Sequence, residues 1–260
     1  MLRGLIRALG AYRFYERMLR KEIESGPMPR HLALILDGNR RWARSKSKPP
    51  WYGHAVGAEK VEEVLKWCLE LGIETITLYV LSTENLKRER EELEKLLEII
   101  ENHLRKALNE RMFDEHEVRV RALGRLELLP PSIRDLLTEL ERKTSRYSRH
   151  FLNVAIAYGG RAEIVDAVRN IVRDVRKGKL REEDIDERTF ENYLYTSHLP
   201  NPYPDLIIRT SGEVRLSNFL LWQSAYSELV FLDVYWPEFR RIDLYRAIRT
   251  YQRRSRRFGL

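Results

Sequence analysis

Cysteine is almost absent from the sequence, because Cys68 is the single one among 260 residues. A lone cysteine excludes an intramolecular disulfide and a metal site made of several thiolates. Cys68 shares a helical apolar stripe with Val61, Val64 and Leu65, so we expect it to pack as a small core side chain. The lack of disulfides fits a reducing compartment and predicts a cytoplasmic protein.

Long hydrophobic runs are also missing. No apolar run approaches the roughly 20 residues that span a bilayer, and the basic N-terminus lacks the continuous hydrophobic segment of a signal peptide. The sequence has no internal repeat and no low-complexity linker, so its composition marks no domain boundary. We expect one domain over residues 27–260, preceded by an amphipathic helix over residues 1–26, in a protein that is soluble or peripheral to a membrane.

Several familiar catalytic motifs are absent. The chain has no Walker A loop, no GxGxxG, no HExxH and no GxSxG, so the reactions that depend on these motifs lack support. What the sequence has in excess is positive charge, with 47 lysines and arginines against 39 acidic residues and a net charge of +8. This charge favours an anionic partner, which is nucleic acid, anionic lipid or a phosphorylated metabolite.

Six short apolar runs have the length of buried strands. Most are separated by helical patterns, which predicts a single α/β domain with a mostly parallel six-stranded sheet between helices. The runs are 32–36, 73–81, 118–123, 151–158, 206–208 and 229–232. Ligands of such sheets bind beyond the carboxyl ends of the strands. Polar clusters stand just there, at 37–42, 82–85, 159–161 and 209–218.

The first cluster follows a strand and opens a helix. Backbone N–H groups, Gly38 and the guanidinium groups of Arg40 and Arg41 would converge at that helix N-terminus, which suits a phosphorylated ligand. Asp37 beside them would suit Mg²⁺ that contacts phosphate oxygens. The alternative is that Asp37 or Asn39 only caps the helix.

The other clusters are equally open when each is taken alone. His54 either donates to a diphosphate or is structural, and Ser82 to Asn85 read as a helix cap. Arg209 and Arg215 with neighbouring hydroxyl groups suit a diphosphate. Glu228 is either a second metal carboxylate or a surface side chain.

Together the clusters resemble the cis-prenyltransferase family of undecaprenyl and dehydrodolichyl diphosphate synthases. The resemblance runs from about His31 to Gly259, and the Arg at position 40 is similar to the archaeal and eukaryotic branch. It rests on six blocks in a distinctive order, His31–Ala43, Gly53–His54, Ser82–Asn85, Ala157–Arg161, Asp205–Gln223 and Tyr226–Leu229.

The resemblance implies the fold and the activity. The fold would be that of undecaprenyl diphosphate synthase, with a hydrophobic tunnel. The activity would be Mg²⁺-dependent addition of isopentenyl diphosphate in cis to geranylgeranyl or farnesyl diphosphate. The product would be a long-chain polyprenyl diphosphate, the precursor of a glycosyl carrier lipid. Two alternatives remain, a non-catalytic accessory subunit that shares the fold and a basic nucleic-acid-binding module.

The resemblance also implies roles for individual residues. Asp37 and Asn85 would be catalytic, and Asp37 and Glu228 would lie at the metal. The allylic diphosphate would contact Gly38, Asn39, Arg40, Arg41, His54 and Arg88, with Trp42, Ser82 and Glu84 as further substrate contacts. Isopentenyl diphosphate would contact Arg209, Arg215 and Ser217, and Arg257 and Gly259 would reach it from the partner of a homodimer. No nucleic acid is expected.

Two residues depart from the pattern of the family. Pro50 stands where many members have an arginine, so one contact to the allylic diphosphate is in doubt. Leu86 replaces a common tryptophan and puts the shape of the allylic pocket in doubt.

Two helical stretches leave their function open. The stretch from Arg88 to Met112 carries Leu93, Leu97, Ile100, Leu104 and Leu108, which would line a tunnel or form a core stripe. The first 25 residues combine an apolar stripe with arginines. They would lie on a membrane or over the tunnel mouth, or pack against the domain.

Overall fold

The computed structural model describes the backbone of residues 2–254 and the side chains of residues 10–254. Six strands form one sheet in the order β3-β4-β2-β1-β5-β6, and each neighbouring pair is parallel. The strands are β1 (His31–Ile35), β2 (Thr75–Ser82), β3 (Val118–Leu123), β4 (His150–Tyr158), β5 (Leu206–Arg209) and β6 (Glu228–Phe231). Each predicted apolar run overlaps one of them, which confirms the six-stranded sheet.

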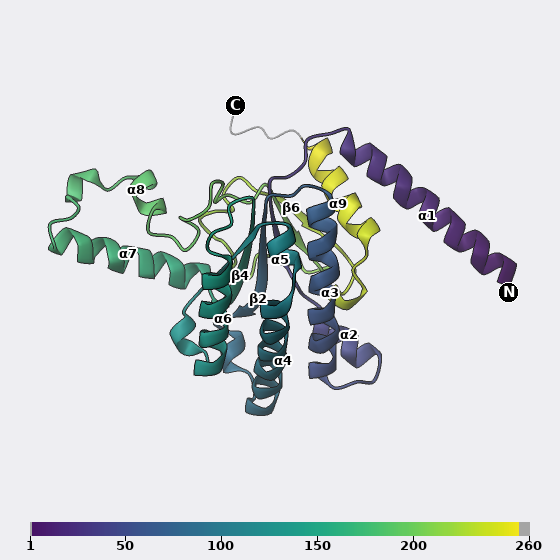
Figure 1. The fold of residues 1–260 in the computed structure, drawn as a ribbon, viewed down its shortest axis with the longest axis horizontal. Helices are drawn as coiled ribbons and strands as arrows, with labels where there is room; N and C mark the ends of the chain where they lie inside the picture. Colours follow the sequence, from purple (N-terminus) through teal and green to yellow (C-terminus); the bar gives the residue numbers. More distant parts are fainter. Residues whose placement is uncertain (1, 255–260) are drawn as a thin grey trace.

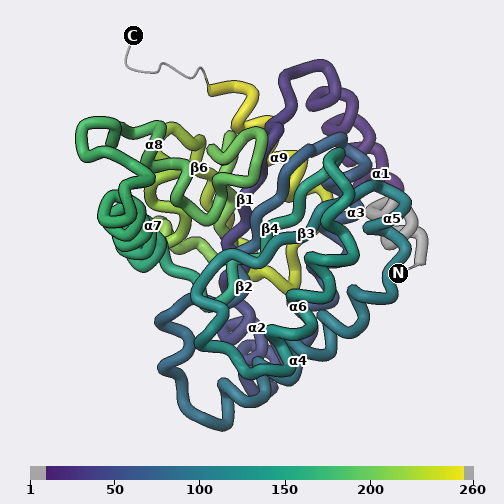
Figure 2. Tube along the Cα trace, turned by 60° about the vertical axis from the view of Figure 1, so that its left-hand side comes forward, coloured from purple at the N-terminus to yellow at the C-terminus, as the bar shows by residue number. Residues whose placement is uncertain are grey.

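Helices flank the sheet on both sides. They are α1 (Leu2–Glu24), α2 (Asn39–Ser45), α3 (Pro50–Glu70), α4 (Arg90–Asn109), α5 (Met112–Glu115), α6 (Pro131–Thr144), α7 (Gly160–Arg176), α8 (Glu187–Glu191) and α9 (Arg241–Arg253). In Figures 1 and 2, α3, α4 and α6 lie on one side of the strands, and α7 and α8 lie on the other. The arrangement is the predicted layered α/β domain.

The strands divide their side chains between the two faces. In β1, Leu32 and Leu34 join the larger core beneath the helices, whereas Ala33 and Ile35 join a smaller core on the opposite face. Successive residues of a strand point to opposite faces, so a fully apolar strand is expected where both faces are covered. The smaller core is closed largely by the irregular segment that carries Phe219.

The amphipathic N-terminal segment forms α1, which packs against α9. Leu19 and Ile23 are fully buried there, and Glu22 forms ion pairs with Arg249 at 3.4 Å and Arg253 at 2.7 Å. The C-terminal part of α1 therefore packs against the domain, which is one of the two expected arrangements. Within the described part of the chain, no helix is long and apolar enough to cross a membrane.

A buried polar row crosses the smaller core at the amino ends of three strands. His31 Nε2 lies 2.8 Å from the hydroxyl of Thr77, which also accepts a hydrogen bond from Asn153 at 3.0 Å. The other ring nitrogen of His31 lies 3.1 Å from the carbonyl oxygen of Asn201, to which it donates. Burial lowers the pKa of His31 to about 4, so its imidazole is neutral near pH 7.

We predict that His31 makes the fold sensitive to acid. Its pKa of about 4 in the folded protein lies below the ordinary value of 6.5, so the stabilisation is fully present above pH 6.5 and is lost as the pH falls toward 4. For this one group, the free energy of unfolding at pH 5 is about 2 kcal/mol lower than at pH 7. His31→Gln should therefore lose less free energy of unfolding between pH 7 and pH 5 than the wild type, as measured by urea denaturation.

The matched control is His116→Gln, because His116 is exposed. This variant should retain the wild-type pH dependence. If His31→Gln loses as much stability on acidification as the wild type, the assignment of acid sensitivity to His31 is wrong.

Candidate active site

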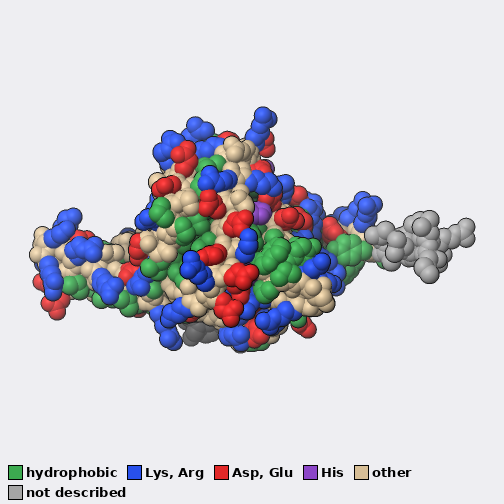
Figure 3. Space-filling view, turned by 90° about the horizontal axis from the view of Figure 1, so that it is seen from below, with side chains coloured by type: hydrophobic (Ala, Val, Ile, Leu, Met, Phe, Trp, Pro, Cys, Tyr) green, Lys and Arg blue, Asp and Glu red, His purple; other side chains and the backbone are tan. Residues whose placement is uncertain are grey.

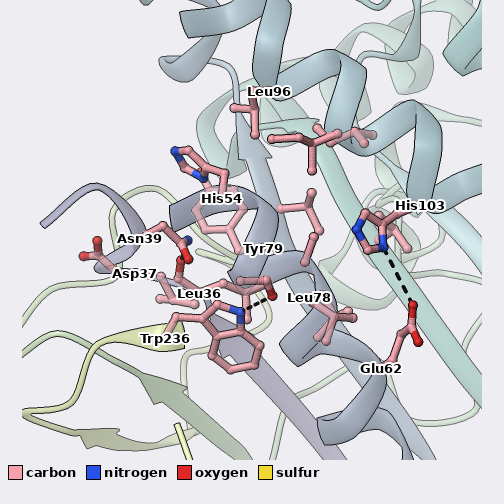
Figure 4. A pocket seen from close by; sticks show the side chains of 18 of the residues that line it. Leu36, Asp37, Asn39, His54, Glu62, Leu78, Tyr79, Leu96, His103 and Trp236 are labelled. Carbon is pink, nitrogen blue, oxygen red and sulfur yellow. Dashed lines mark hydrogen bonds and ion pairs between the residues drawn. The ribbon is translucent and has the colours of Figure 1, made fainter. Parts of the chain in front are cut away.

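Three of the four predicted polar clusters meet at the carboxyl ends of β1, β2 and β5. Together with the first turns of α3 they line one end of a cavity of about 670 Å³. The cluster at 159–161 contributes no residue to the wall. The polar residues in the wall are Asp37, Gly38, Asn39, Arg40, Arg41, His54, Ser82, Asn85, Arg88, Arg209, Arg215 and Ser217. Figure 4 shows Asp37, Asn39 and His54 close together at this end. Segments far apart in the sequence thus form one charged chamber.

Asp37 is held at the centre of this chamber by two arginines. Nη2 of Arg209 donates to Oδ2 of Asp37 at 2.6 Å, and the guanidinium of Arg41 lies 3.4 Å from Oδ1. Oδ1 also accepts the backbone N–H of Gly38 at 2.6 Å. Burial raises the pKa of Asp37, but the hydrogen bond and charge of Arg209 outweigh it, so the pKa lies below its ordinary value. Asp37 is therefore ionised at neutral pH.

Gly38 gives the chain its sharp turn beside Asp37. Its φ of 103° lies in the left-handed region, where a side chain is strained. A Cβ at this position would also lie 2.7 Å from the ring of Tyr235. Glycine is therefore required for the turn that leads from β1 into α2.

Arg209 is the most buried cation of the chamber, since the residue is only 4% exposed. Its Nη1 donates to the hydroxyl of Ser217 at 2.8 Å. Nε of Arg209 and Nε of Arg40 are both buried, and in the described chain neither has a hydrogen-bond partner. Buried donors without partners are costly, and these two belong to arginines that line the chamber.

His54 and Arg88 face each other on a second wall of the chamber. Arg88 Nη1 lies 3.2 Å from His54 Nε2 and 3.0 Å from Glu92, while Arg40 lies 3.3 Å from the other oxygen of Glu92. Burial first, and then Arg88 and Arg40, lower the pKa of His54 to about 4. His54 is thus neutral, accepts from Arg88 through Nε2 and retains an N–H at Nδ1.

Two acidic residues that the sequence analysis missed hold the arginines in place. Glu92 bridges Arg40 and Arg88, and Glu213 accepts from Arg41 at 2.8 Å and from Arg215 at 2.6 Å. Glu213 stands inside the fourth polar cluster, so its closeness to Arg215 was a usable signal. Glu92 reads in the sequence as an ordinary charge on a helix.

Ser82 and Asn85 cap the short turn that follows β2. The backbone N–H of Ser82 donates to Asn85 Oδ1 at 3.2 Å, and that of Asn85 donates to the Ser82 hydroxyl at 3.1 Å. The capping alternative is therefore realised, yet both residues also line the chamber. Glu84 points elsewhere, since it accepts from Asn218 at 3.0 Å and is not part of the chamber wall.

Several expected site residues do not join the chamber within this chain. Trp42 stacks on Tyr52 and donates to Glu238. Glu228 begins β6 and pairs with Arg254 at 2.9 Å, whereas Phe231, three residues further on, is aligned with Arg209. This offset is roughly 10 Å along the strand, so Glu228 and Asp37 lie at opposite ends of the sheet. Arg257 and Gly259 lie outside the described residues.

Beyond the charged chamber the cavity becomes a largely apolar tunnel between α3, α4 and the sheet. Its wall includes Leu65, Leu78, Val80, Ile100, Leu104, Phe113, Leu140 and Leu152. Figure 4 shows Leu78 and Leu96 along this wall, and a contact between His103 Nδ1 and Glu62 Oε1 at 3.8 Å. Ile100 and Leu104 of the predicted stripe line the tunnel, while Leu93, Leu97 and Leu108 do not.

The comparisons with known proteins agree with this geometry. A prenyltransferase family model, described as undecaprenyl diphosphate synthase, matches residues 35–259. The chain belongs to this family. The tritrans,polycis-undecaprenyl-diphosphate synthase (geranylgeranyl-diphosphate specific) of Pyrococcus abyssi is 57% identical over 249 residues, which are 96% of this chain and 94% of that protein.

Further relatives extend the comparison. The enzyme of the same name from Methanopyrus kandleri is 54% identical and covers 95% of this chain and 91% of its own length. A crystal structure of lavandulyl diphosphate synthase from Lavandula x intermedia in complex with dimethylallyl diphosphate has a TM-score of 0.87. It is 37% identical and covers 90% of this chain and 99% of that chain. The predicted cis-prenyltransferase family and its fold are confirmed, and the activity is cis-prenyl chain elongation.

We predict that Ile100 controls product length. Its side chain is 8% exposed and lies in the tunnel wall. Ile100→Trp should obstruct the tunnel and shorten the products, and Ile100→Ala should widen it and lengthen them. Chromatography of the products, made from labelled isopentenyl diphosphate, measures the change.

Leu93 offers a matched control, because it lies on the same helix but not in the tunnel wall. The same two substitutions there should leave the products unchanged. An unaltered product ladder from folded, active Ile100 variants would show that Ile100 is only a core residue.

Proposed function

We propose that this chain adds isopentenyl diphosphate in cis to geranylgeranyl diphosphate and makes a long-chain polyprenyl diphosphate, the precursor of a glycosyl carrier lipid. The observation that carries the proposal is the single cavity that joins an arginine-rich chamber to an apolar tunnel. Such a cavity suits a ligand with a diphosphate at one end and a hydrocarbon chain at the other. The primer follows from the names of the archaeal relatives, with farnesyl diphosphate as the alternative.

The arginines of the chamber would divide between two diphosphates. Arg40, Arg41 and Arg88, with Gly38, Asn39 and His54, would bind the allylic diphosphate at the tunnel entrance. Arg209, Arg215 and Ser217 would bind isopentenyl diphosphate on the side of β5.

Asp37 fits the role of a ligand for Mg²⁺. It is ionised, lines the chamber and stands between the two groups of arginines. The described residues contain no group of three or more side chains that would hold a metal by themselves. Mg²⁺ is often held by one or two carboxylates together with phosphate oxygens and water, so a single aspartate is sufficient. The ion would neutralise charge on the leaving diphosphate.

The reaction requires the allylic C1–O bond to break while the double bond of isopentenyl diphosphate attacks and its C2 loses a proton. Arg40, Arg41 and Arg88 would stabilise the charge that develops on the departing diphosphate. Ser82 and Asn85, held rigidly by their reciprocal hydrogen bonds, would orient the attacking group. The base that accepts the C2 proton of isopentenyl diphosphate would be Asn85, Ser82 or a diphosphate oxygen.

The active unit would be a homodimer. On α7, Val165, Val168 and Val172 form a helical stripe in which each residue is 44–46% exposed. Together with α8 this helix extends from the body of the molecule (Figure 1). We propose that a second copy covers this stripe, and that Arg257 and Gly259 of each chain reach the isopentenyl diphosphate site of the other. Glu228 lies at the end of β6 far from Asp37 of its own chain. It would therefore serve the metal site of the other chain in the dimer.

We predict that Asp37→Ala abolishes turnover in a chain that still folds but is less stable, because Arg209 loses its partner. Removal of the carboxylate would lower kcat by about a thousandfold, since several kcal/mol of transition-state stabilisation depend on the bound ion. Incorporation of labelled isopentenyl diphosphate with and without EDTA measures the activity, and the thermal midpoint checks the fold.

The exposed Asp135 provides the control, and Asp135→Asn should behave as the wild type. Near-normal activity of Asp37→Ala would contradict the assignment. Failure of the wild type to use either primer would favour the accessory-subunit alternative.

We predict complementation between two inactive variants. Homodimers of Asp37→Ala and of Arg257→Ala should each be severely impaired, but a heterodimer pairs one intact Asp37 site with one intact donated tail. It should recover up to about half of the wild-type activity, because two-fold symmetry gives one good site of two. Purification through two different tags isolates the heterodimer, and no recovery would mean that each tail serves its own chain.

A further inference from the structure

We propose that the corner between α2 and α3 docks the enzyme on an anionic lipid bilayer, next to the entrance of the tunnel. The α2–α3 corner is defined here as Arg44, Lys46, Lys48, Trp51 and Tyr52. Each of these residues is exposed, and they follow one another within nine positions. The proposal concerns binding, so its main test does not depend on the proposed primer or product.

The corner is a rigid turn. Ser47 adopts a left-handed φ of 54° after α2, and the backbone N–H groups of Ser47 and Lys48 return to the carbonyl oxygens of Arg44 and Ala43 at 3.0 and 2.9 Å. This pair of bonds ends the helix in a Schellman motif. Pro50 then occupies the first turn of α3, where proline favours the start of a helix. The backbone of the turn therefore fixes the positions from which these side chains extend.

The aromatic side chains of the corner face solvent in spite of their size. Trp51 is 42% exposed and Tyr52 is 36% exposed. The ring of Tyr52 stacks on Trp42 with a centroid distance of 6.0 Å, and the ammonium of Lys48 lies 5.8 Å from the centre of the Tyr52 ring. Trp51 meets Tyr52 edge-on at 6.3 Å. Tryptophan and tyrosine rings of this kind are typical of the bilayer interface.

The charge of the corner identifies the type of surface that it fits. Arg44, Lys46 and Lys48 are its ionisable groups apart from Tyr52, and the facing acid is Glu238, which lies 3.3 Å from Lys46. Basic side chains close to apolar rings favour an anionic bilayer, to which each lysine near the surface contributes about 1 kcal/mol.

The corner is joined to the tunnel entrance by tight packing. Trp51 stands three residues before His54 on the same helix, so the two lie side by side, and His54 lines the chamber. At Gly53, a Cβ would lie 2.0 Å from the backbone oxygen of Asn39, so α2 and α3 cannot move apart without loss of this contact. A bilayer at the corner would therefore lie close to the entrance through which prenyl chains enter.

The pictures place the corner at the end of the molecule where the strands finish. In Figure 1, α2 and the start of α4 lie at this lower end. The view from below shows hydrophobic side chains with lysine and arginine beside them on the side of α2 (Figure 3). By its sequence, the N-terminal helix α1 is another candidate membrane-binding segment. Its Leu19 and Ile23 are buried in the core and are not available to a bilayer.

Vesicle flotation tests the proposal directly, with vesicles of phosphatidylcholine alone and of phosphatidylcholine mixed with phosphatidylglycerol. The wild type should float with the anionic vesicles, and Trp51→Ser should bind them several-fold more weakly. The double variant Lys46→Gln, Lys48→Gln should lose about fivefold for each lysine, from the contribution of about 1 kcal/mol per side chain. Circular dichroism and turnover of a detergent-solubilised primer should match the wild type.

Three matched variants elsewhere on the surface serve as controls. Tyr203→Ser removes an exposed aromatic ring, the double variant Lys177→Gln, Lys179→Gln removes two exposed charges, and Phe14→Ser removes an exposed ring on α1. These should bind the anionic vesicles as the wild type does. The proposal is overturned if the wild type does not bind, if the corner variants bind normally, or if Phe14→Ser alone abolishes binding.

Discussion

The structure depends on the ion pair between Asp37 and Arg209, which joins the ends of β1 and β5. The hydroxyl of Thr210 reinforces it by donating to the backbone oxygen of Asp37 at 2.7 Å. Arg209 is nearly buried, and a buried charge is tolerated only when it is paired and hydrogen-bonded. This pair therefore keeps one anion and one cation facing the same chamber. In the proposed function, a metal ion would contact Asp37 and a diphosphate would contact Arg209 when the substrates bind.

The tunnel differs from the charged chamber, because it is an apolar space that the surrounding side chains leave unfilled. Protein interiors are normally close-packed, so a cavity of about 670 Å³ means that α3 and α4 are held apart. The ion pairs of Glu62 with Lys106, and of Glu92 with Arg40 and Arg88, connect the elements on either side of this space. Charged contacts at the entrance and along the wall thus link the elements that enclose the apolar cavity.

The sequence predicted the six strands and the polar clusters because buried parallel strands are continuous apolar runs that end in ligand-binding loops. It could not predict contacts that arise only from folding. Glu92 looks like a solvated helical charge, yet it bridges two arginines of the chamber. Glu228 looks like a metal ligand by resemblance, yet the register of β6 places it at the other end of the sheet. The stripe on α4 likewise gives no sign that Ile100 faces the tunnel and Leu97 does not.

The most direct test of this account is a crystal structure of the protein with Mg²⁺ and geranylgeranyl thiodiphosphate, an analogue with a poor leaving group. We expect its diphosphate to contact Arg40, Arg41 and Arg88, and its hydrocarbon chain to lie between α3 and α4 beside Ile100. A chain bound outside this cavity, or a diphosphate far from Asp37, would contradict the central claim that one continuous cavity binds both parts of the substrate.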